Sequence, residues 1–103
     1  MIETLINNTI YHRGKNAIDN KNLIDSSEKE WYWFHLHNYP SCHIVICKDK
    51  INIKEARIAK QMILNNTKYK EATQICYTKI KNLIHGEEIG SVNFILNGHV
   101  KII

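Results

Sequence analysis

The sequence predicts an α+β fold: a single domain of 103 residues with a mixed β-sheet, β-hairpins at both ends, and one short and one longer helix packed on the sheet. Strand-favouring runs alternate with two capped helical segments. An Asn-Gly pair at 97–98 lies between two apolar runs, which is the strongest short-range signal for a hairpin. The stretch 31–46 holds both tryptophans and three of the six histidines, and its pattern is typical of two strands joined by a tight loop.

The chain is expected to open with a β-hairpin. Residues 4–6 and 9–13 are short β-favouring runs. Asn7 and Asn8 lie between them, and asparagine tolerates the positive φ angles of a tight hairpin turn. A strand, a two-residue turn and a second strand therefore account for this segment.

A short helix is predicted at about residues 17–24. Asn16 can cap its first turn, with Asp19 three residues later. Ile18 and Leu23 are expected to supply a small buried stripe. The glycine two residues before Asn16 frees the backbone to turn sharply out of the preceding strand.

The aromatic segment 31–37 is predicted to be a strand with aromatic residues on both faces. Side chains alternate along a strand, so one face carries Tyr32, Phe34 and Leu36, and the other carries Trp31, Trp33, His35 and His37. Two arrangements fit this pattern: a strand that is covered on both faces, or one face that serves as a platform for stacking. After a break at 38–41, the apolar run 43–47 is expected to be a central strand.

The second half of the chain is expected to contain the longer helix and three strands. Asn52 and Glu55 favour a helix start, and the apolar face of a helix at 53–66 would include Ile53, Ala56, Ala59 and Ile63. This helix should lie across the sheet. We expect a strand at 72–80, a connection at 81–90, and a closing hairpin that pairs 91–96 with 99–103 and turns at Asn97-Gly98.

Composition narrows the functional classes. The formal charge of +4 and the pI of about 9.0 favour phosphate-bearing partners or anionic membranes, although a solvated lysine-rich surface gives the same totals. The three cysteines lack CxxC spacing, so we expect reduced thiols rather than a disulfide framework. With no apolar leader and no apolar run long enough to span a bilayer, the expected location is cytoplasmic, with no membrane partner.

The bend from the first hairpin into the short helix is a candidate phosphate site. The first turn of a helix leaves backbone N–H groups unpaired, and here these groups lie beside Arg13 and Lys15. Gly14, Lys15 and Asn16 would then contact a nucleic-acid phosphate. The alternative is a structural turn without a ligand.

Several short motifs follow one another along the chain, namely Gly14-Lys15-Asn16 with Asn20, Trp33-Phe34-His35, Pro40-Ser41-Cys42-His43, Tyr77-Thr78-Lys79-Ile80-Lys81 and Gly90-Ser91-Val92-Asn93-Phe94. In this order and at compatible spacing, they resemble the NFACT-R (DUF814) domain of the NFACT proteins. That superfamily includes ribosome-associated quality-control factors and bacterial fibronectin-binding-protein-like members. Ser41 and Cys42 replace a glycine and a serine of the family, and Lys15 stands where arginine is usual. The resemblance covers nearly the whole chain but does not extend to the other regions of full-length members.

The resemblance implies a stand-alone, non-catalytic RNA-binding domain. Its expected partner is tRNA or ribosomal RNA, with a link to translation or ribosome quality control, and no cofactor or metal is expected. Together with the basic bend, it gives a set of candidate RNA-binding residues: Arg13, Gly14, Lys15, Asn16, Asn20, Trp33, His35, His43, Lys79 and Lys81. Arg13, Lys79 and Lys81 would extend the basic patch if their strands lie nearby.

Other interpretations of the same residues remain open. Trp31 and Trp33 would either stack on bases or pack in the core. A zinc site would draw on the histidines and cysteines of this stretch, including the RNA-binding candidates His35 and His43; the full set is His35, His37, Cys42, His43 and Cys47. No nucleophile elbow, metalloprotease motif or phosphate-binding glycine loop is present, so we expect no enzyme activity. The alternative function is a protein–protein adaptor that docks on a ribosomal or quality-control partner through Trp31 or Tyr39.

Overall fold

The main sheet has six strands in the spatial order β1-β2-β4-β3-β5-β8. The computed structural model describes residues 1–95 and 99–103. The six strands are β1 (Ile2–Ile6), β2 (Thr9–Arg13), β3 (Tyr32–Leu36), β4 (Ile44–Ile46), β5 (Ile75–Lys79) and β8 (Lys101–Ile102). Their pairings are all antiparallel. The α+β class and the central place of β4 are therefore confirmed, but the sheet is antiparallel rather than mixed.

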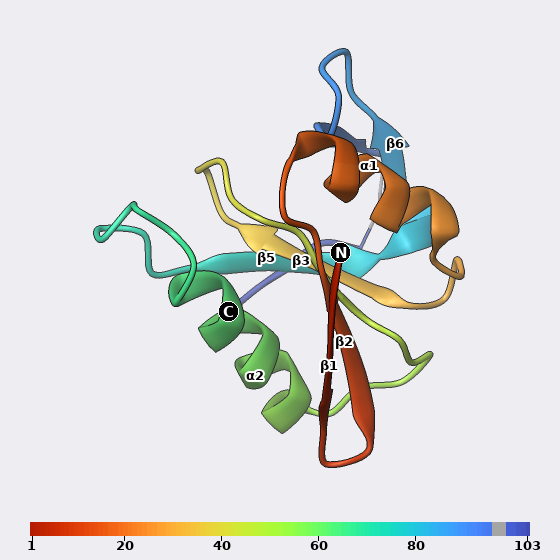
Figure 1. Ribbon diagram of the computed structural model, residues 1–103, viewed down its shortest axis with the longest axis vertical. Coiled ribbons are helices and arrows are strands. Elements are labelled where there is room, and N and C mark those ends of the chain that lie inside the picture. The colour runs from red at the N-terminus through yellow and green to blue at the C-terminus, as the bar shows by residue number, and fades with distance from the viewer. Residues whose placement is uncertain (96–98) are drawn as a thin grey trace.

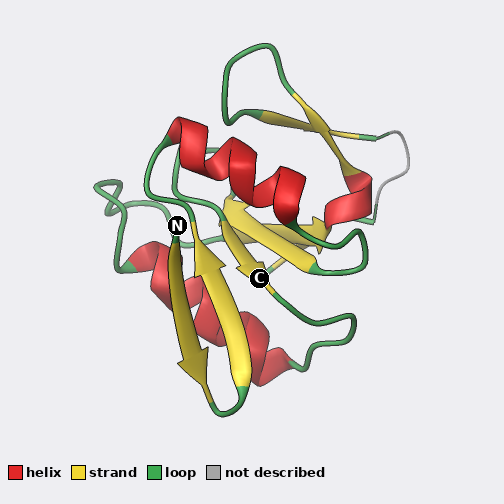
Figure 2. Cartoon of the chain, turned by 45° about the vertical axis from the view of Figure 1, so that its right-hand side comes forward, coloured by secondary structure: helices red, strands yellow, loops and turns green. Residues whose placement is uncertain are grey.

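The two helices cover opposite faces of this sheet (Figure 1). Helix α1 (Ala17–Ser26) and helix α2 (Ile53–Leu64) lie on either side of the strands, as the turned view also shows (Figure 2). Phe34 packs in the apolar cluster on the α2 side, and its neighbour Trp33 packs in the cluster on the α1 side. Of the two arrangements open for β3, the strand covered on both faces is therefore the one observed.

Local signals placed the turns and helix starts correctly. Asn7 and Asn8 have φ angles of 48° and 65°, which close the β1–β2 hairpin as expected. Asn52 caps α2 in a reciprocal capping box with Glu55. The C-terminal ends of the helices were predicted less accurately: α1 continues to Ser26 instead of ending at 24, and α2 stops at Leu64 instead of 66.

Two isoleucines predicted to lie in the core are exposed. Ile18 is 62% exposed, and the buried residues of α1 include Leu23 and Ile24 instead. Ile18 and Leu23 are five residues apart, which places them on different sides of a helix with about 3.6 residues per turn. Ile53, the first residue of α2, is 53% exposed because it lies at the edge of the apolar stripe.

The C-terminal strands pair differently from the prediction. Instead of a plain connection at 81–90, the chain forms a 3-10 turn (Ile80–Asn82) and strand β6 (Leu83–His85). Strand β6 pairs with β7 (Val92–Phe94) in a separate two-stranded sheet, while β8 joins β5. The predicted pairing of 91–96 with 99–103 is therefore wrong, and its Asn97-Gly98 turn lies outside the described residues.

The turn between β6 and β7 explains this pairing. Gly86 N–H donates to the Ser91 carbonyl at 2.9 Å, and Ser91 N–H donates to the Glu88 carbonyl at 3.0 Å. Gly90 has a φ of +84°, which favours glycine, and its backbone lies against Ala17 at the start of α1. These contacts fold 83–94 back beside α1. Within the described residues, no helix is both long and apolar enough to cross a membrane.

Candidate functional site

The junction between β2 and α1 is locked to the start of β4. Gly14 N–H donates to the His43 carbonyl at 3.0 Å, and the side-chain oxygen of Asn20 accepts from His43 N–H at 3.4 Å. A Cβ atom on Gly14 would lie 1.8 Å from that same oxygen, so only glycine fits without a shift of Asn20. Gly14 and Asn20 thus act structurally, and together they fix the position of His43.

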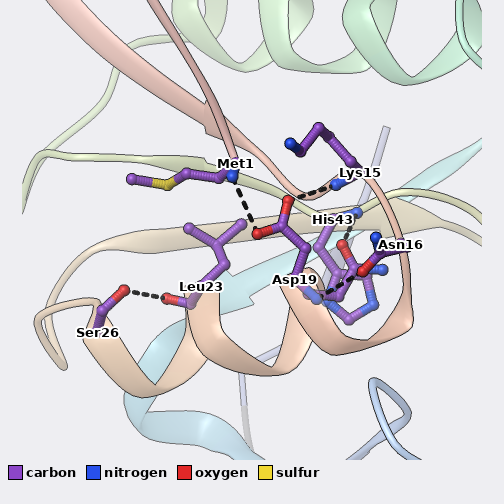
Figure 3. A network of polar contacts seen from close by, with 8 residues as sticks. Met1, Lys15, Asn16, Asp19, Leu23, Ser26 and His43 are labelled. Carbon is purple, nitrogen blue, oxygen red and sulfur yellow. Dashed lines mark hydrogen bonds and ion pairs between the residues drawn. The ribbon is translucent and has the colours of Figure 1, made fainter.

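The start of α1 is capped by its own side chains. Asn16 Oδ1 accepts from Asp19 N–H at 2.8 Å, and Asp19 Oδ2 accepts from Lys15 N–H at 2.8 Å (Figure 3). The Lys15 amide lowers the pKa of Asp19, as does the ammonium group of Met1, which lies 2.9 Å from Asp19 Oδ1. An acidic group therefore occupies part of the expected phosphate site, which corrects the prediction for these amides. The Lys15 side chain remains exposed and extends away from α1 in Figure 3.

Trp33 lies beneath two histidines rather than on the surface. Trp33 is only 1% exposed, so packing in the core is the one observed of the two alternatives left open for this tryptophan. Its indole Nε1–H donates to His43 Nδ1 at 3.1 Å, and its ring is stacked on His35 with centroids 5.5 Å apart. The indole therefore fixes the orientation of both imidazoles.

Both histidines are held neutral. Burial lowers the pKa of His43 to about 3, with a smaller contribution from His35. Burial also lowers the pKa of His35, against the opposing effect of its hydrogen bond to the Leu36 carbonyl. Neither ring adds positive charge to the site at physiological pH.

These residues meet in one cleft with a volume of about 1000 Å3. Eight of the ten predicted RNA-binding residues line it, namely Arg13, Gly14, Lys15, Asn16, Asn20, Trp33, His35 and His43. Lys79 and Lys81 are not among the lining residues. Both pair with Glu30, at 2.8 and 2.9 Å, near the opposite end of β3. The structure therefore separates these two lysines from the others.

Comparison with known proteins identifies the fold. No protein-family model matches the chain, and no curated protein matches it. A solved structure does match: the C-terminal part of the fibronectin/fibrinogen-binding protein from Streptococcus suis, with a TM-score of 0.84 and 21% sequence identity. The two share a fold. The match covers 98% of this chain and 44% of the other, so this chain spans less than half of that structure.

Two parts of the cleft were missed by the sequence-based prediction. The loop after α2 brings Lys68 and Tyr69 to its wall, where Lys68 Nζ lies 5.4 Å from the Tyr69 ring centroid. Phe94 of β7 closes another side and meets the edge of Trp33, with centroids 5.8 Å apart. The Lys-Tyr-Lys run at 68–70 is the only local signal for the first part, and nothing near Phe94 signals the second.

The cleft is moderately basic. Its charged lining residues are three cations, Arg13, Lys15 and Lys68, and one carboxylate, Glu88. The cations come from the β2–α1 junction and the loop after α2, whereas Glu88 belongs to the turn between β6 and β7. A surplus of cations around a neutral floor attracts an anionic ligand without placing a buried charge beneath it.

A second cluster of reactive groups lies outside the cleft. Cys47 Sγ is 3.5 Å from His12 Nδ1, and His12 Nε2 is 2.7 Å from Glu3, the order of a thiol nucleophile, a base and an orienting acid. Burial raises the pKa of Cys47 to about 11, with help from Glu3 and Glu28, so the thiol stays protonated. Within the described residues, no group of three suitable side chains could hold a metal ion.

Proposed function

We propose that this chain is a small, non-catalytic RNA-binding module that holds RNA across the cleft. One observation carries the proposal: eight of ten candidate residues, scattered between 13 and 43, converge on a single cleft. The cations at this cleft would contact phosphate groups, since such contacts supply much of the affinity for nucleic acids.

Two further observations support the proposal. The motif resemblance to the NFACT-R domain extends to fibronectin-binding-protein-like members, and the matching solved structure belongs to a protein of that description. On this basis the RNA is tRNA or ribosomal RNA, the location is the cytoplasm, and the role is linked to translation or ribosome quality control.

Titration of labelled tRNA at low and moderate salt tests the proposal. Affinity should fall steeply with salt, because released counterions drive binding. Lys15→Glu should weaken binding about tenfold at low salt and reduce the salt slope by about one. Lys54→Glu is the matched control, because Lys54 is exposed on α2 and does not line the cleft. Absence of binding at both salt concentrations would refute the proposed function.

A protein–protein adaptor is the second candidate. The matching structure belongs to a protein named for binding fibronectin and fibrinogen, and exposed Ile84 and Ile89 give this chain apolar surface near β6. The anchors expected from sequence are less exposed than predicted: Trp31 packs edge-on against His12, and Tyr39 packs on Tyr69. A pull-down of a ribosomal or quality-control protein that survives nuclease and high salt would favour this candidate.

A further inference from the structure

The floor of the cleft carries one hydrogen-bond acceptor and one donor. His35 Nδ1 lies 2.7 Å from the Leu36 carbonyl, which can only accept, so this nitrogen carries the proton and Nε2 is an acceptor. His43 Nδ1 accepts from Trp33, so in the neutral ring Nε2 carries the proton and is a donor. The two rings are 5.1 Å apart, edge to face. Among the described residues, neither Nε2 atom has a protein partner.

The acceptor on His35 and the donor on His43 differ from the groups of an ordinary phosphate site. Phosphate is recognised by cations and N–H donors, whereas a neutral acceptor beside a neutral donor matches a ligand edge with the complementary order. Every nucleobase presents such an edge when it is unpaired, because a ring nitrogen or carbonyl lies next to an N–H group. The locked tautomers of His35 and His43 keep one of each kind in the cleft.

The walls of the cleft supply the other contacts that a nucleotide needs. Phe94 is 41% exposed and lines the cleft, as do Tyr39 and Tyr69, whose rings are 5.1 Å apart. Aromatic faces stack with bases of any sequence. Arg13 and Lys15 lie at the β2–α1 junction, where they can reach a phosphate group. A volume of about 1000 Å3 is ample for one nucleotide.

We propose that the cleft binds one unpaired RNA base, with its hydrogen-bonding edge against His35 and His43 and its phosphate beside Arg13 and Lys15. This inference rests on the proposed RNA-binding function and sharpens it. The ligand is then a loop or a single-stranded end rather than a continuous duplex. A duplex binds only through the cations, and its affinity is correspondingly weaker.

Binding of a stem-loop RNA and of a blunt duplex with the same stem tests this inference. The stem-loop should bind more tightly, and His35→Phe should remove about tenfold of its affinity while leaving duplex binding unchanged. Phenylalanine preserves the ring that stacks on Trp33 but removes the Nε2 acceptor. His85→Phe is the control, because His85 does not line the cleft. Equal affinities of the two RNAs for the natural protein would overturn the base site and leave RNA binding intact.

A measurement on the unaltered protein tests the same site without the risk that the His35→Phe variant misfolds. Adenosine and cytidine monophosphates should shift the NMR signals of the His35 and His43 rings, whereas ribose 5-phosphate, which lacks a base, should shift only signals near Arg13 and Lys15. If all three compounds leave the histidine signals unchanged, the base site is refuted. If neither RNA binds at any salt concentration, the proposed function fails and the base site fails with it.

Discussion

The two faces of the sheet differ in the size of their apolar clusters and in the polar side chains that they carry. The α2 face buries a cluster of ten residues, which is so apolar that the Tyr11 hydroxyl has no hydrogen-bond partner among the described residues. Among the described residues, the apolar cluster on the α1 face has only six buried members. Beyond them the same face carries His35 and His43, whose side chains line the cleft.

The difference shows how a chain of this size can hold polar groups in its interior. A small domain has little stability to spare, and buried polar groups cost free energy unless each finds a partner. Here the α2 face supplies most of the apolar burial, while Trp33 and Asn20 supply partners for His43 on the other face. The α1 face can therefore combine packing with a binding site.

The largest predicted effect compares two isoleucines near the C-terminal ends of the helices. Ile63 of α2 is fully buried in the larger cluster, and Ile24 of α1 is buried in the smaller one. Ile63→Ala should lower the free energy of unfolding by about 4 kcal/mol, and Ile24→Ala by about 2 kcal/mol, because Ile24 is 7% exposed and its less enclosed site can relax around the lost atoms. Urea denaturation measures both. Equal losses would contradict the contrast between the faces.

A smaller effect on stability concerns Glu55, a buried acid in the first turn of α2. Burial alone would raise its pKa, but hydrogen bonds from Lys48, Thr9 and the Asn52 amide outweigh burial and lower the pKa from 4.5 to about 2. The folded state thus holds the proton less tightly than the unfolded chain. The contribution of Glu55, about 2 kcal/mol, is fully present above pH 4.5 and is lost as the pH falls towards 2.

Acid denaturation of Glu55→Gln measures this contribution. The variant should be less stable than the natural protein at neutral pH, and the two stabilities should converge as the pH falls from 4.5 towards 2. Glu71→Gln is the control, because Glu71 is exposed and should leave the pH dependence unchanged. If the stability of Glu55→Gln changed with pH as steeply as that of the natural protein, other carboxylates would be responsible for the acid sensitivity.

Features that depend on a few neighbouring residues could be predicted from the sequence. Asn16 and Asn52 cap their helices, and Asn7-Asn8 closes its turn, because each of these contacts is made within four residues. The predicted members of the cleft came from the basic bend before α1 and from the motif resemblance, and they are close together because β2, β3 and β4 are neighbours in the sheet.

Features that depend on distant packing could not be predicted. Alternation along β3 left both faces equivalent, and the packing of α1 and β7 against the sheet puts Trp33 inside. Strand β6 has three residues and no strong signal, so its pairing with β7 depends on contacts with α1. Lys68 is far from Lys15 in the sequence, and the loop after α2 alone brings it to the cleft.

The smallest predicted effect is a coupling of about 1 kcal/mol between Gly14 and Asn20, which tests whether the α1 face depends on their contact. Gly14→Ala should cost about 1–3 kcal/mol of stability, because its Cβ would displace the Asn20 amide and break the bond to His43. In an Asn20→Ala background the same change should cost about 1 kcal/mol less, since the clashing oxygen is gone. In an Asn22→Ala background, which removes an exposed asparagine of the same helix, the cost should stay the same. Additive costs in all three backgrounds would show that something other than Asn20 requires glycine at this position, and His43 would then be held chiefly by Trp33.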